Sequence, residues 1–264
     1  MRENPQVSSK VVSQAILSEK IAILDTLNGW HHIASSDGYL GWVPTNAIIT
    51  RDTYLHNVCV NRLMAHLYEI DDTEYGPLMT LPYGTKLQAE EMENDRWLNV
   101  LLPCGKKGFI QSGDVSFEGK LFTKEELIDF SLRFLNLPYT WGGRSSFGFD
   151  CSGFVQMLYE RLGIQLQRDS VQQMTDTRFL EVPCSNLAPC DLIFFGRSQD
   201  KITHVGMSLD KDRFIHATSG ENQPWIRISH LSEKAWSGAP SSLLPFRQAC
   251  SLPLNMIKIA HEHL

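Results

Sequence analysis

One cysteine of this chain lies at the expected start of a helix. Cys151 follows Asp150 and precedes Ser152, and a helical pattern runs over residues 152–162. The first backbone N–H groups of a helix have no partner within it, and together with the helix dipole they favour a thiolate. We therefore expect a lowered pKa for Cys151, a role as nucleophile, and an oxyanion site at the same N–H groups.

A nucleophilic thiol needs a base, and two histidines have the spacing to supply one. His204 lies in a β-like run that ends near a turn at residues 210–212, and His216 lies in the run that returns. If these runs pair as a hairpin, the imidazoles fall within a rung or two of each other. One ring can then accept the Cys151 proton while the other fixes its orientation. Each residue alone also fits a packing or surface role, but the combination favours catalysis.

The remaining cysteines lack such neighbours. No C-x-x-C pair occurs and no histidine lies at finger spacing, which argues against a structural zinc site. In the absence of a secretion signal we expect reduced thiols rather than disulfides. Five residues are therefore interpreted as small hydrophobic side chains, namely Cys59, Cys104, Cys184, Cys190 and Cys250.

Composition and charge narrow the class of protein. The chain has 264 residues, a length that usually divides into more than one domain. A formal net charge of −6 without a Lys/Arg run argues against nucleic acid as a partner. No stretch approaches the ~20 apolar residues that span a bilayer, and the amino terminus lacks the apolar region of a signal peptide. We expect a soluble, cytoplasmic monomer, with export by an unrecognised route as the alternative.

The first 117 residues predict small β-barrels. Short β-like runs, such as residues 39–43 and 97–102, alternate with Asn-Gly, Asp-Gly and other turn signals, and one helix candidate covers residues 63–68. We place the two barrels at residues 1–52 and 53–118.

A weak internal repeat supports this division. Trp30 precedes Gly41 by the same spacing with which Trp97 precedes Gly108, and each glycine is followed by an aromatic and an aliphatic residue. A duplicated strand–hairpin–strand unit explains both copies. Chance similarity over so short a stretch is the alternative.

After residue 117 the pattern changes to helices followed by strands. Thr123 and Glu126 have the spacing of a capping box and open a helical run, residues 125–135. Beyond the helix that follows Cys151 come three β-like runs, residues 192–195, 204–209 and 213–217. This order is typical of the α+β class. We place the domain at residues 119–250 and a tail at 251–264.

Five motifs in this part of the chain resemble the NlpC-type cell-wall peptidases. In chain order they are Pro138-Tyr139-Thr140-Trp141-Gly142-Gly143, Asp150-Cys151-Ser152-Gly153-Phe154-Val155, Asp191-Leu192-Ile193-Phe194-Phe195, His204-Val205-Gly206 and Ile215-His216-Ala217. The resemblance covers residues 120–247. The paired modules in front resemble bacterial SH3 (SH3b) domains, and the whole resembles γ-D-glutamyl-L-diamino acid endopeptidases of the dipeptidyl-peptidase VI type.

The resemblance implies a papain-like α+β catalytic domain preceded by two small SH3-like β-barrels. It makes Cys151 the nucleophile, His204 the base and His216 the third residue, with no metal or organic cofactor. It also places Tyr139 beside the nucleophile, where it positions substrate or aids the oxyanion.

Further substrate-binding residues follow from the same resemblance. Asp150 and Ser152 flank the nucleophile in the matching positions, and Trp141 forms a wall of the pocket. Asp169 and Ser170 match the segment of members that act on peptides with a free amino-terminal L-Ala. There a carboxylate meets the ammonium group, because a desolvated cation needs a charged partner.

The first SH3b-like module is expected to contribute to the same pocket. Tyr39 occupies the place of a substrate contact, and Glu19 is a candidate for the acidic residue that the family uses from this module. In the second module Phe109 replaces the tryptophan and Gln111 replaces the proline of the first copy. The pattern therefore does not support ligand binding by that module, and a role as a buttress for the catalytic domain is the alternative.

The expected activity is hydrolysis of the bond between γ-D-Glu and the diamino acid, meso-diaminopimelate or L-Lys, in peptidoglycan stem peptides. Two alternatives stay open. One is an N-acetylmuramoyl-L-alanine amidase, and the other is an inactive SH3b module that binds wall or protein.

Overall fold

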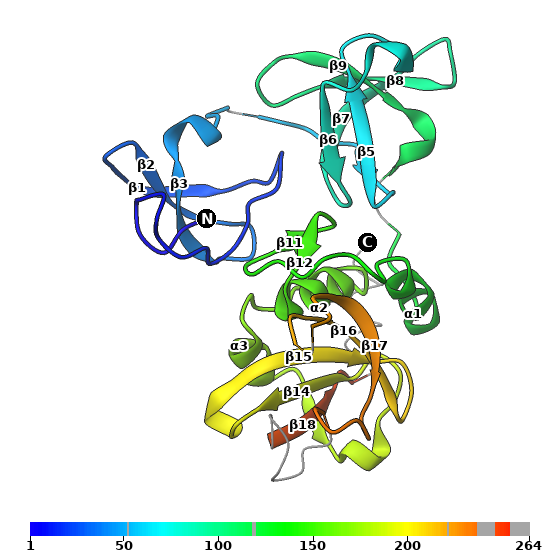
Figure 1. Ribbon diagram of the computed structural model, residues 1–264. Helices are drawn as coiled ribbons and strands as arrows, with labels where there is room; N and C mark the ends of the chain where they lie inside the picture. The colour runs from blue at the N-terminus through cyan, green and yellow to red at the C-terminus, as the bar shows by residue number, and fades with distance from the viewer. Residues whose placement is uncertain (52, 118–119, 221, 237–245, 254–264) are drawn as a thin grey trace. The chain divides into compact units, whose positions relative to one another are not determined.

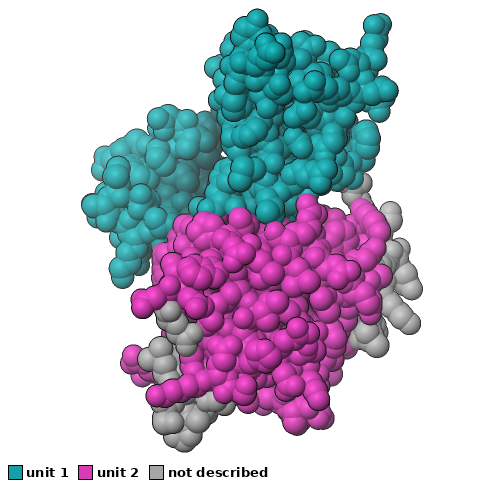
Figure 2. All heavy atoms as spheres, turned by 45° about the vertical axis from the view of Figure 1, so that its right-hand side comes forward, with its two compact units in different colours: residues 1–119, 145–147 teal, residues 120–144, 148–264 magenta. Residues whose placement is uncertain are grey.

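The computed structural model describes residues 1–51, 53–117, 120–220, 222–236 and 246–253 (Figure 1). The chain divides into two compact units, coloured separately in Figure 2: residues 1–119 with 145–147, and residues 120–144 with 148–264. Most of the expected tail, residues 254–264, lies outside the described residues. Within the described ranges, every helix is too short or too polar to cross a membrane.

The first sheet lies near the amino terminus. It contains the antiparallel strands β1 (Ala22–Leu27), β2 (Trp30–Ala34) and β3 (Leu40–Pro44), in that order. Asn28 and Gly29 both have positive φ, 49° and 79°, at the turn between β1 and β2. Asn-Gly is the pair that a tight hairpin of this kind requires, because both turn residues adopt left-handed backbone conformations.

The second sheet follows it in the chain. Its described strands are β4 (Val58–Val60), β5 (Met64–Tyr68), β6 (Met79–Pro82), β7 (Lys86–Glu91), β8 (Trp97–Leu101), β9 (Lys107–Gln111) and β10 (Val115–Phe117). They pair in the order β10-β4-β7-β8-β9-β5-β6. Buried side chains such as Leu67, Val100 and Ile110 form its core.

The helix expected over residues 63–68 is wrong. These residues form strand β5, which pairs with β6 and β9. Ala65 and Leu67 are buried while Met64 is exposed and His66 half-buried, so the side chains alternate in exposure as in a strand. The apolar run is too short to choose a helix by itself, and pairing with two neighbours decides the strand.

The internal repeat corresponds to two hairpins of the same register. Trp30 pairs with Pro44 across β2 and β3, and Trp97 pairs with Gln111 across β8 and β9. In each copy the second strand of the hairpin runs into a 3-10 turn, Thr45–Ala47 after β3 and Ser112–Asp114 after β9. The repeat predicted from the sequence is therefore a repeat of structure.

The second unit begins with helices. They are α1 (Lys124–Leu132), α2 (Cys151–Glu160) and α3 (Ser170–Met174). The short strands β11 (Arg144–Ser145) and β12 (Gly148–Phe149) come before α2, and the second residue of β11 belongs to the stretch 145–147 of the first unit. The capping box at the start of α1 is confirmed: Thr123 Oγ1 accepts from the Glu126 N–H, and the Glu126 carboxylate accepts from the Thr123 N–H at 2.9 Å.

A six-stranded antiparallel sheet completes this unit. Its strands are β13 (Leu180–Val182), β14 (Leu192–Gly196), β15 (Ile202–Ser208), β16 (Arg213–Thr218), β17 (Trp225–His230) and β18 (Phe246–Ser251), in the order β13-β18-β14-β15-β16-β17. Helices α2 and α3 lie on one side of this sheet, and α2 packs against β15 and β16 (Figure 1). The unit therefore has the α+β arrangement expected from the sequence.

Three phenylalanine rings fix α2 within this unit. Phe154 on α2 packs against Phe149 on β12 and against Phe134 just after α1, with ring centroids 5.6 Å and 5.9 Å apart. All three side chains are buried. Burying a side chain of this size contributes about 2 kcal/mol or more, so the start of α2 has a fixed position relative to the preceding loop.

Candidate active site

Cys151 begins α2, as the sequence predicts. Asp150 caps the helix, and its Oδ1 accepts the Gly153 N–H at 2.7 Å. The cysteine is 8% exposed. Its sulfur lies within reach of two backbone N–H groups, those of Ser152 and Val205, and both favour the charged form of the thiol. Because Val205 follows His204 directly, the sulfur lies against the strand that carries the candidate base.

The pKa of Cys151 differs from our expectation. Burial raises it to about 12, and the negative charge of Asp150 acts in the same direction. The two backbone N–H groups and the Arg168 guanidinium lower the pKa, but they do not compensate for lost hydration. The expectation of a lowered pKa is therefore wrong. The resting group is a thiol, so a base must remove its proton during attack.

His204 and His216 form a hydrogen-bonded pair. His204 Nε2 lies 2.7 Å from His216 Nδ1, and His216 Nε2 lies 3.1 Å from Ser229 Oγ. If His204 donates from Nε2, His216 accepts at Nδ1 and donates from Nε2 to the serine. This tautomer leaves a lone pair on Nδ1 of His204. The arrangement therefore suits a base whose orientation is fixed by a second imidazole.

Both imidazoles are held neutral. Burial lowers the pKa of His204 to about 3, and the positive charge of Arg227 lowers it further. Burial likewise lowers the pKa of His216 well below its usual value. The ring centroid of Trp236 lies 5.0 Å from that of His204 and 4.8 Å from that of His216. His204 is thus in the basic form needed to accept a proton.

A glycine makes room for the pair. Met207 on β15 pairs with Ile215 on β16, so Gly206 comes opposite His216. A Cβ added to Gly206 would lie 2.7 Å from the Phe214 ring and 3.1 Å from the Cβ of His216. A larger residue at this position would therefore displace the second imidazole.

Tyr139 and Trp141 lie in the loop before α2. The Tyr139 N–H donates to the Pro224 carbonyl at 2.7 Å, which ties this loop to the segment before β17. Burial, followed by the charges of Cys151 and Asp150, raises the pKa of Tyr139 above its usual value. Its phenol therefore stays protonated near the thiol and can donate a hydrogen bond. The side chain of Trp141 is 70% exposed.

Asp150 and Ser152 flank the nucleophile and bond to a buried arginine. Arg168 donates from Nη1 to Asp150 Oδ1 at 3.0 Å, from Nη2 to Oδ2 at 2.6 Å, and from Nη1 to Ser152 Oγ at 2.9 Å. The Gly142 N–H also donates to Asp150 Oδ2, at 3.0 Å. These contacts give Asp150 and Ser152 structural roles. Their place among the substrate-binding residues stays a prediction.

Asp169 and Ser170 open α3. Asp169 is the N-cap residue and Ser170 the first residue of the helix, and both are half-buried. The Asp169 N–H donates to Gln172 Oε1 at 3.3 Å. Asp169 directly follows Arg168, whose guanidinium bonds to Asp150 and Ser152 at the start of α2.

Tyr39 and Glu19 belong to the first unit and are described within it. Tyr39 lies between β2 and β3, and its N–H donates to Asp37 Oδ1 at 3.1 Å. Glu19 Oε1 accepts from Ser36 Oγ at 2.6 Å. The substrate contacts expected of both residues stay predictions.

Four residues of the site carry no predicted role. Arg168 directly precedes Asp169 in the chain, and Gly206 follows the His204-Val205 pair. Ser229 and Trp236 meet the imidazoles only through folding. The His-Val-Gly triplet is a signal from which the glycine could have been found.

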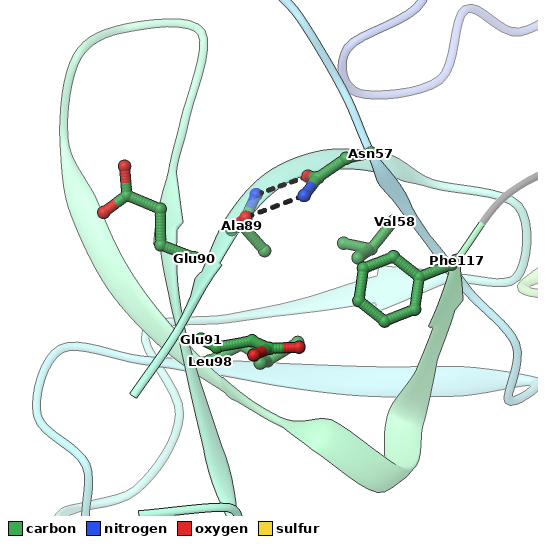
Figure 3. A pocket seen from close by; sticks show the side chains of 7 residues that line it. All are labelled: Asn57, Val58, Ala89, Glu90, Glu91, Leu98 and Phe117. Carbon is green, nitrogen blue, oxygen red and sulfur yellow. Dashed lines mark hydrogen bonds between the residues drawn. The ribbon is translucent and has the colours of Figure 1, made fainter. Parts of the chain in front are cut away.

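A pocket of about 330 Å³ lies elsewhere, on the second sheet (Figure 3). It is lined by Asn57, Val58, Ala89, Glu90, Glu91, Leu98 and Phe117. The Asn57 amide exchanges two hydrogen bonds of 2.8 Å with the Ala89 backbone, so this side chain has a structural role in the wall of the pocket. This lining supplies two carboxylates but neither a thiol nor an imidazole, so Cys151 is the better candidate for chemistry.

Two family models match the chain. Residues 136–241 match the NlpC/P60 family, and residues 1–48 match the bacterial dipeptidyl-peptidase Sh3 domain. The first match contains the cysteine and both histidines described above. The second contains the β1–β3 sheet.

Curated relatives match most of the chain. It is 30% identical to a gamma-D-glutamyl-L-lysine dipeptidyl-peptidase of Bacillus cereus, over 81% of this chain and 69% of that protein. It is 28% identical to a protein of the same name from Bacillus subtilis, over 78% of this chain and 72% of that protein. The crystal structure of an NlpC/P60 family protein from Bacillus cereus superimposes with a TM-score of 0.74 at 28% identity, covering 85% of this chain and 78% of the other.

Proposed function

Since this chain belongs to the NlpC/P60 family, we propose that it is a cysteine endopeptidase that cuts the bond between γ-D-Glu and the diamino acid of peptidoglycan stem peptides. One observation carries the proposal: the 2.7 Å contact between His204 and His216, on strands packed against the helix that Cys151 begins. The choice of bond follows the names of the two Bacillus relatives, which are gamma-D-glutamyl-L-lysine dipeptidyl-peptidases.

In the first step the sulfur of Cys151 attacks the γ-carbonyl carbon while its proton passes to Nδ1 of His204. Nε2 of the resulting imidazolium donates to His216, whose far nitrogen is fixed by Ser229 at 3.1 Å. Backbone N–H groups at the start of α2 and the Tyr139 hydroxyl are the donors for the oxyanion. Because burial raises the pKa of the thiol, Cys151 starts from its protonated form and needs His204 to accept its proton.

The tetrahedral intermediate then collapses. His204 gives its proton to the leaving α-amine of the diamino acid, and a thioester forms between Cys151 and the γ-carbonyl. Neutral His204 next takes a proton from water, whose oxygen attacks the thioester carbon. Breaking the C–S bond returns the proton to sulfur and releases L-Ala-γ-D-Glu.

A free amino terminus on the substrate is part of the proposal. Asp169 is half-buried at the start of α3, and a partly desolvated carboxylate is a suitable partner for an ammonium group. Ser170 adds a hydroxyl beside it. Trp141, with its exposed indole, offers an apolar wall.

We also infer that the strands between residues 53 and 118 form a second SH3-like barrel. The equal hairpin registers of the two copies support this inference. In the second copy Phe109 and Gln111 replace Trp42 and Pro44, so a structural role suits it better than ligand binding.

The test is cleavage of defined peptides. We expect L-Ala-γ-D-Glu-L-Lys, or its meso-diaminopimelate analogue, to yield the dipeptide L-Ala-γ-D-Glu, as identified by mass spectrometry. An N-acetylated version should be cut at least about 10-fold more slowly, since it lacks the charge that pairs with Asp169.

Other products would point elsewhere. Release of a whole stem peptide from a muramoyl peptide would mean an amidase. Binding of muropeptides without cleavage, together with a thiol at Cys151 that iodoacetamide does not modify, would mean a binding module. Either result would contradict the proposal.

A further inference from the structure

Arg168 is a buried cation for which the proposed chemistry has no direct use. It is 2% exposed and lies between α2 and α3. Its guanidinium makes a two-pronged contact with Asp150, at 3.0 Å and 2.6 Å, and a third contact with Ser152 Oγ at 2.9 Å. One side chain therefore holds both neighbours of Cys151.

The geometry of this contact is rigid. A guanidinium is a planar fork, and two parallel bonds to one carboxylate fix its direction as well as its distance. The carboxylate is fixed in turn by the N–H groups of Gly153 and Gly142, at 2.7 Å and 3.0 Å. The position of Arg168 is thus set relative to the first turn of α2.

A second side chain joins the same two segments. The amide of Gln173, on α3, donates to the carbonyl of Ser152 at 3.1 Å and to that of Gln167 at 2.8 Å. Gln173 is fully buried. The segment over residues 167–173 is therefore tied to the start of α2 at two points, one on each side of Asp169.

We propose that Arg168 is a positioning residue that sets the span between the carboxylate of Asp169 and the sulfur of Cys151. It thereby determines how far from a free amine the enzyme cuts. The Asp169 carbonyl also accepts from the Gln173 N–H at 2.9 Å, so contacts on both sides of Asp169 leave it little freedom. This inference rests on the proposed function, in which Asp169 receives the substrate amine.

The test compares Arg168→Lys with the wild-type enzyme on three peptides. They are L-Ala-γ-D-Glu-L-Lys, its N-acetyl form, and Gly-L-Ala-γ-D-Glu-L-Lys, whose amine lies one residue further from the bond. Lysine keeps the charge but has no fork. We expect kcat/KM on the first peptide to fall about 100-fold, the size of effect that a misplacement of about 1 Å produces. The preference for that peptide over the other two should shrink at least about 10-fold.

Two measurements separate positioning from folding. Alkylation of Cys151 by iodoacetamide requires the thiol and its base but not Asp169, so its rate in Arg168→Lys should stay within about 3-fold of wild type. Arg178→Lys is the matched control, because Arg178 makes a similar fork to Asp176, from Nε to Oδ1 at 3.0 Å and from Nη2 to Oδ2 at 2.5 Å, away from Cys151. This control should leave both selectivity and alkylation unchanged.

Each outcome has one reading. An unchanged preference in Arg168→Lys overturns the inference alone. Equal loss of alkylation and of cleavage of all three peptides also overturns it, since Arg168 would then only hold the fold. A wild-type enzyme that cuts all three peptides equally overturns the proposed amine recognition and the inference together. If Arg168→Lys does not fold, Asp150→Asn/Arg168→Gln replaces it, because that pair buries no charge. Asp150→Asn alone is then the reference, and the same readings apply to the difference between these two variants.

Discussion

Two buried cysteines of the second unit have nearly the same titration behaviour and different surroundings. Burial raises the pKa of Cys151 and of Cys190 to about 12. The thiol of Cys190 donates to the Lys124 carbonyl at 3.4 Å, whereas the sulfur of Cys151 meets the backbone N–H groups of Ser152 and Val205. Burial and pKa do not separate the two cysteines. The difference is that Cys151 lies against the strand that carries His204 and meets N–H groups that can hold a negative charge.

The largest expected difference between the two cysteines is in the loss of activity when each is replaced. Cys151→Ala should lower kcat/KM by about 10⁵-fold or more, because a covalent step is lost. Cys190→Ala removes a sulfur of the same burial and should leave kcat/KM within about 3-fold, although it lowers the free energy of unfolding by about 1 kcal/mol. Both are measured by steady-state kinetics on the tripeptide and by thermal unfolding. Comparable losses of kcat/KM in both variants would mean that activity depends on a buried cysteine in general and not on the place of Cys151 at the start of α2.

The next largest effect concerns the two imidazoles. His204→Ala should lower kcat by about 10⁴-fold, since it removes the base. His216→Ala should lower kcat by about 10- to 100-fold, because the base loses only its orienting partner. KM should change little in either variant. A larger loss for His216 than for His204 would exchange the two assigned roles.

The rate of alkylation by iodoacetamide should depend on pH differently at the two cysteines. The lowered pKa of His204, about 3, keeps this base unprotonated down to mildly acidic pH. Modification of Cys151 should therefore vary little between pH 5 and pH 8. We expect no base to assist at Cys190, so its alkylation rate should rise about 10-fold per pH unit, in step with its thiolate fraction. Peptide mapping after timed quenching gives both rates, and equal slopes for both thiols would refute assistance by His204.

A glycine tests how closely the second imidazole is held. Gly206→Ala should lower the free energy of unfolding by about 1–3 kcal/mol, because the new Cβ meets the Phe214 ring at 2.7 Å. It should also lower kcat by about 10-fold through displacement of His216, while alkylation of Cys190 stays as in wild type. Gly113→Ala is the control, since its Cβ would meet nothing within 4 Å. A stable, fully active Gly206→Ala would contradict the tight packing.

The last expected effect is on stability in acid. His204 has a pKa of about 3 in the folded chain and an ordinary value of 6.5 when unfolded. Between these values the unfolded chain binds more protons, so the free energy of unfolding falls as the pH drops from 6.5 towards 3. His204→Gln removes this group and should show a shallower slope in chemical denaturation at several pH values. Identical slopes would mean that other groups control acid unfolding.

Local patterns in the sequence determined much of this molecule. Asp150 caps the helix that begins at Cys151, and Thr123 and Glu126 form their capping box, because these bonds join residues only a few positions apart. The two Trp-to-Gly repeats fold into hairpins of equal register. The spacing of His204 and His216 was enough to predict that they meet, since a tight turn leaves a returning strand few registers.

Other features of the fold and of the site depend on tertiary contacts that the sequence pattern does not reveal. Residues 64–68 form a strand because β6 and β9 pair with them, which a short apolar run cannot reveal. The sign of the pKa change at Cys151 depends on hydration lost to distant elements, so the helix start alone predicted it wrongly. Arg168 and Trp236 reach the site from segments far along the chain. Neighbours in sequence fix local geometry, whereas desolvation and long-range contacts exist only once the chain has packed.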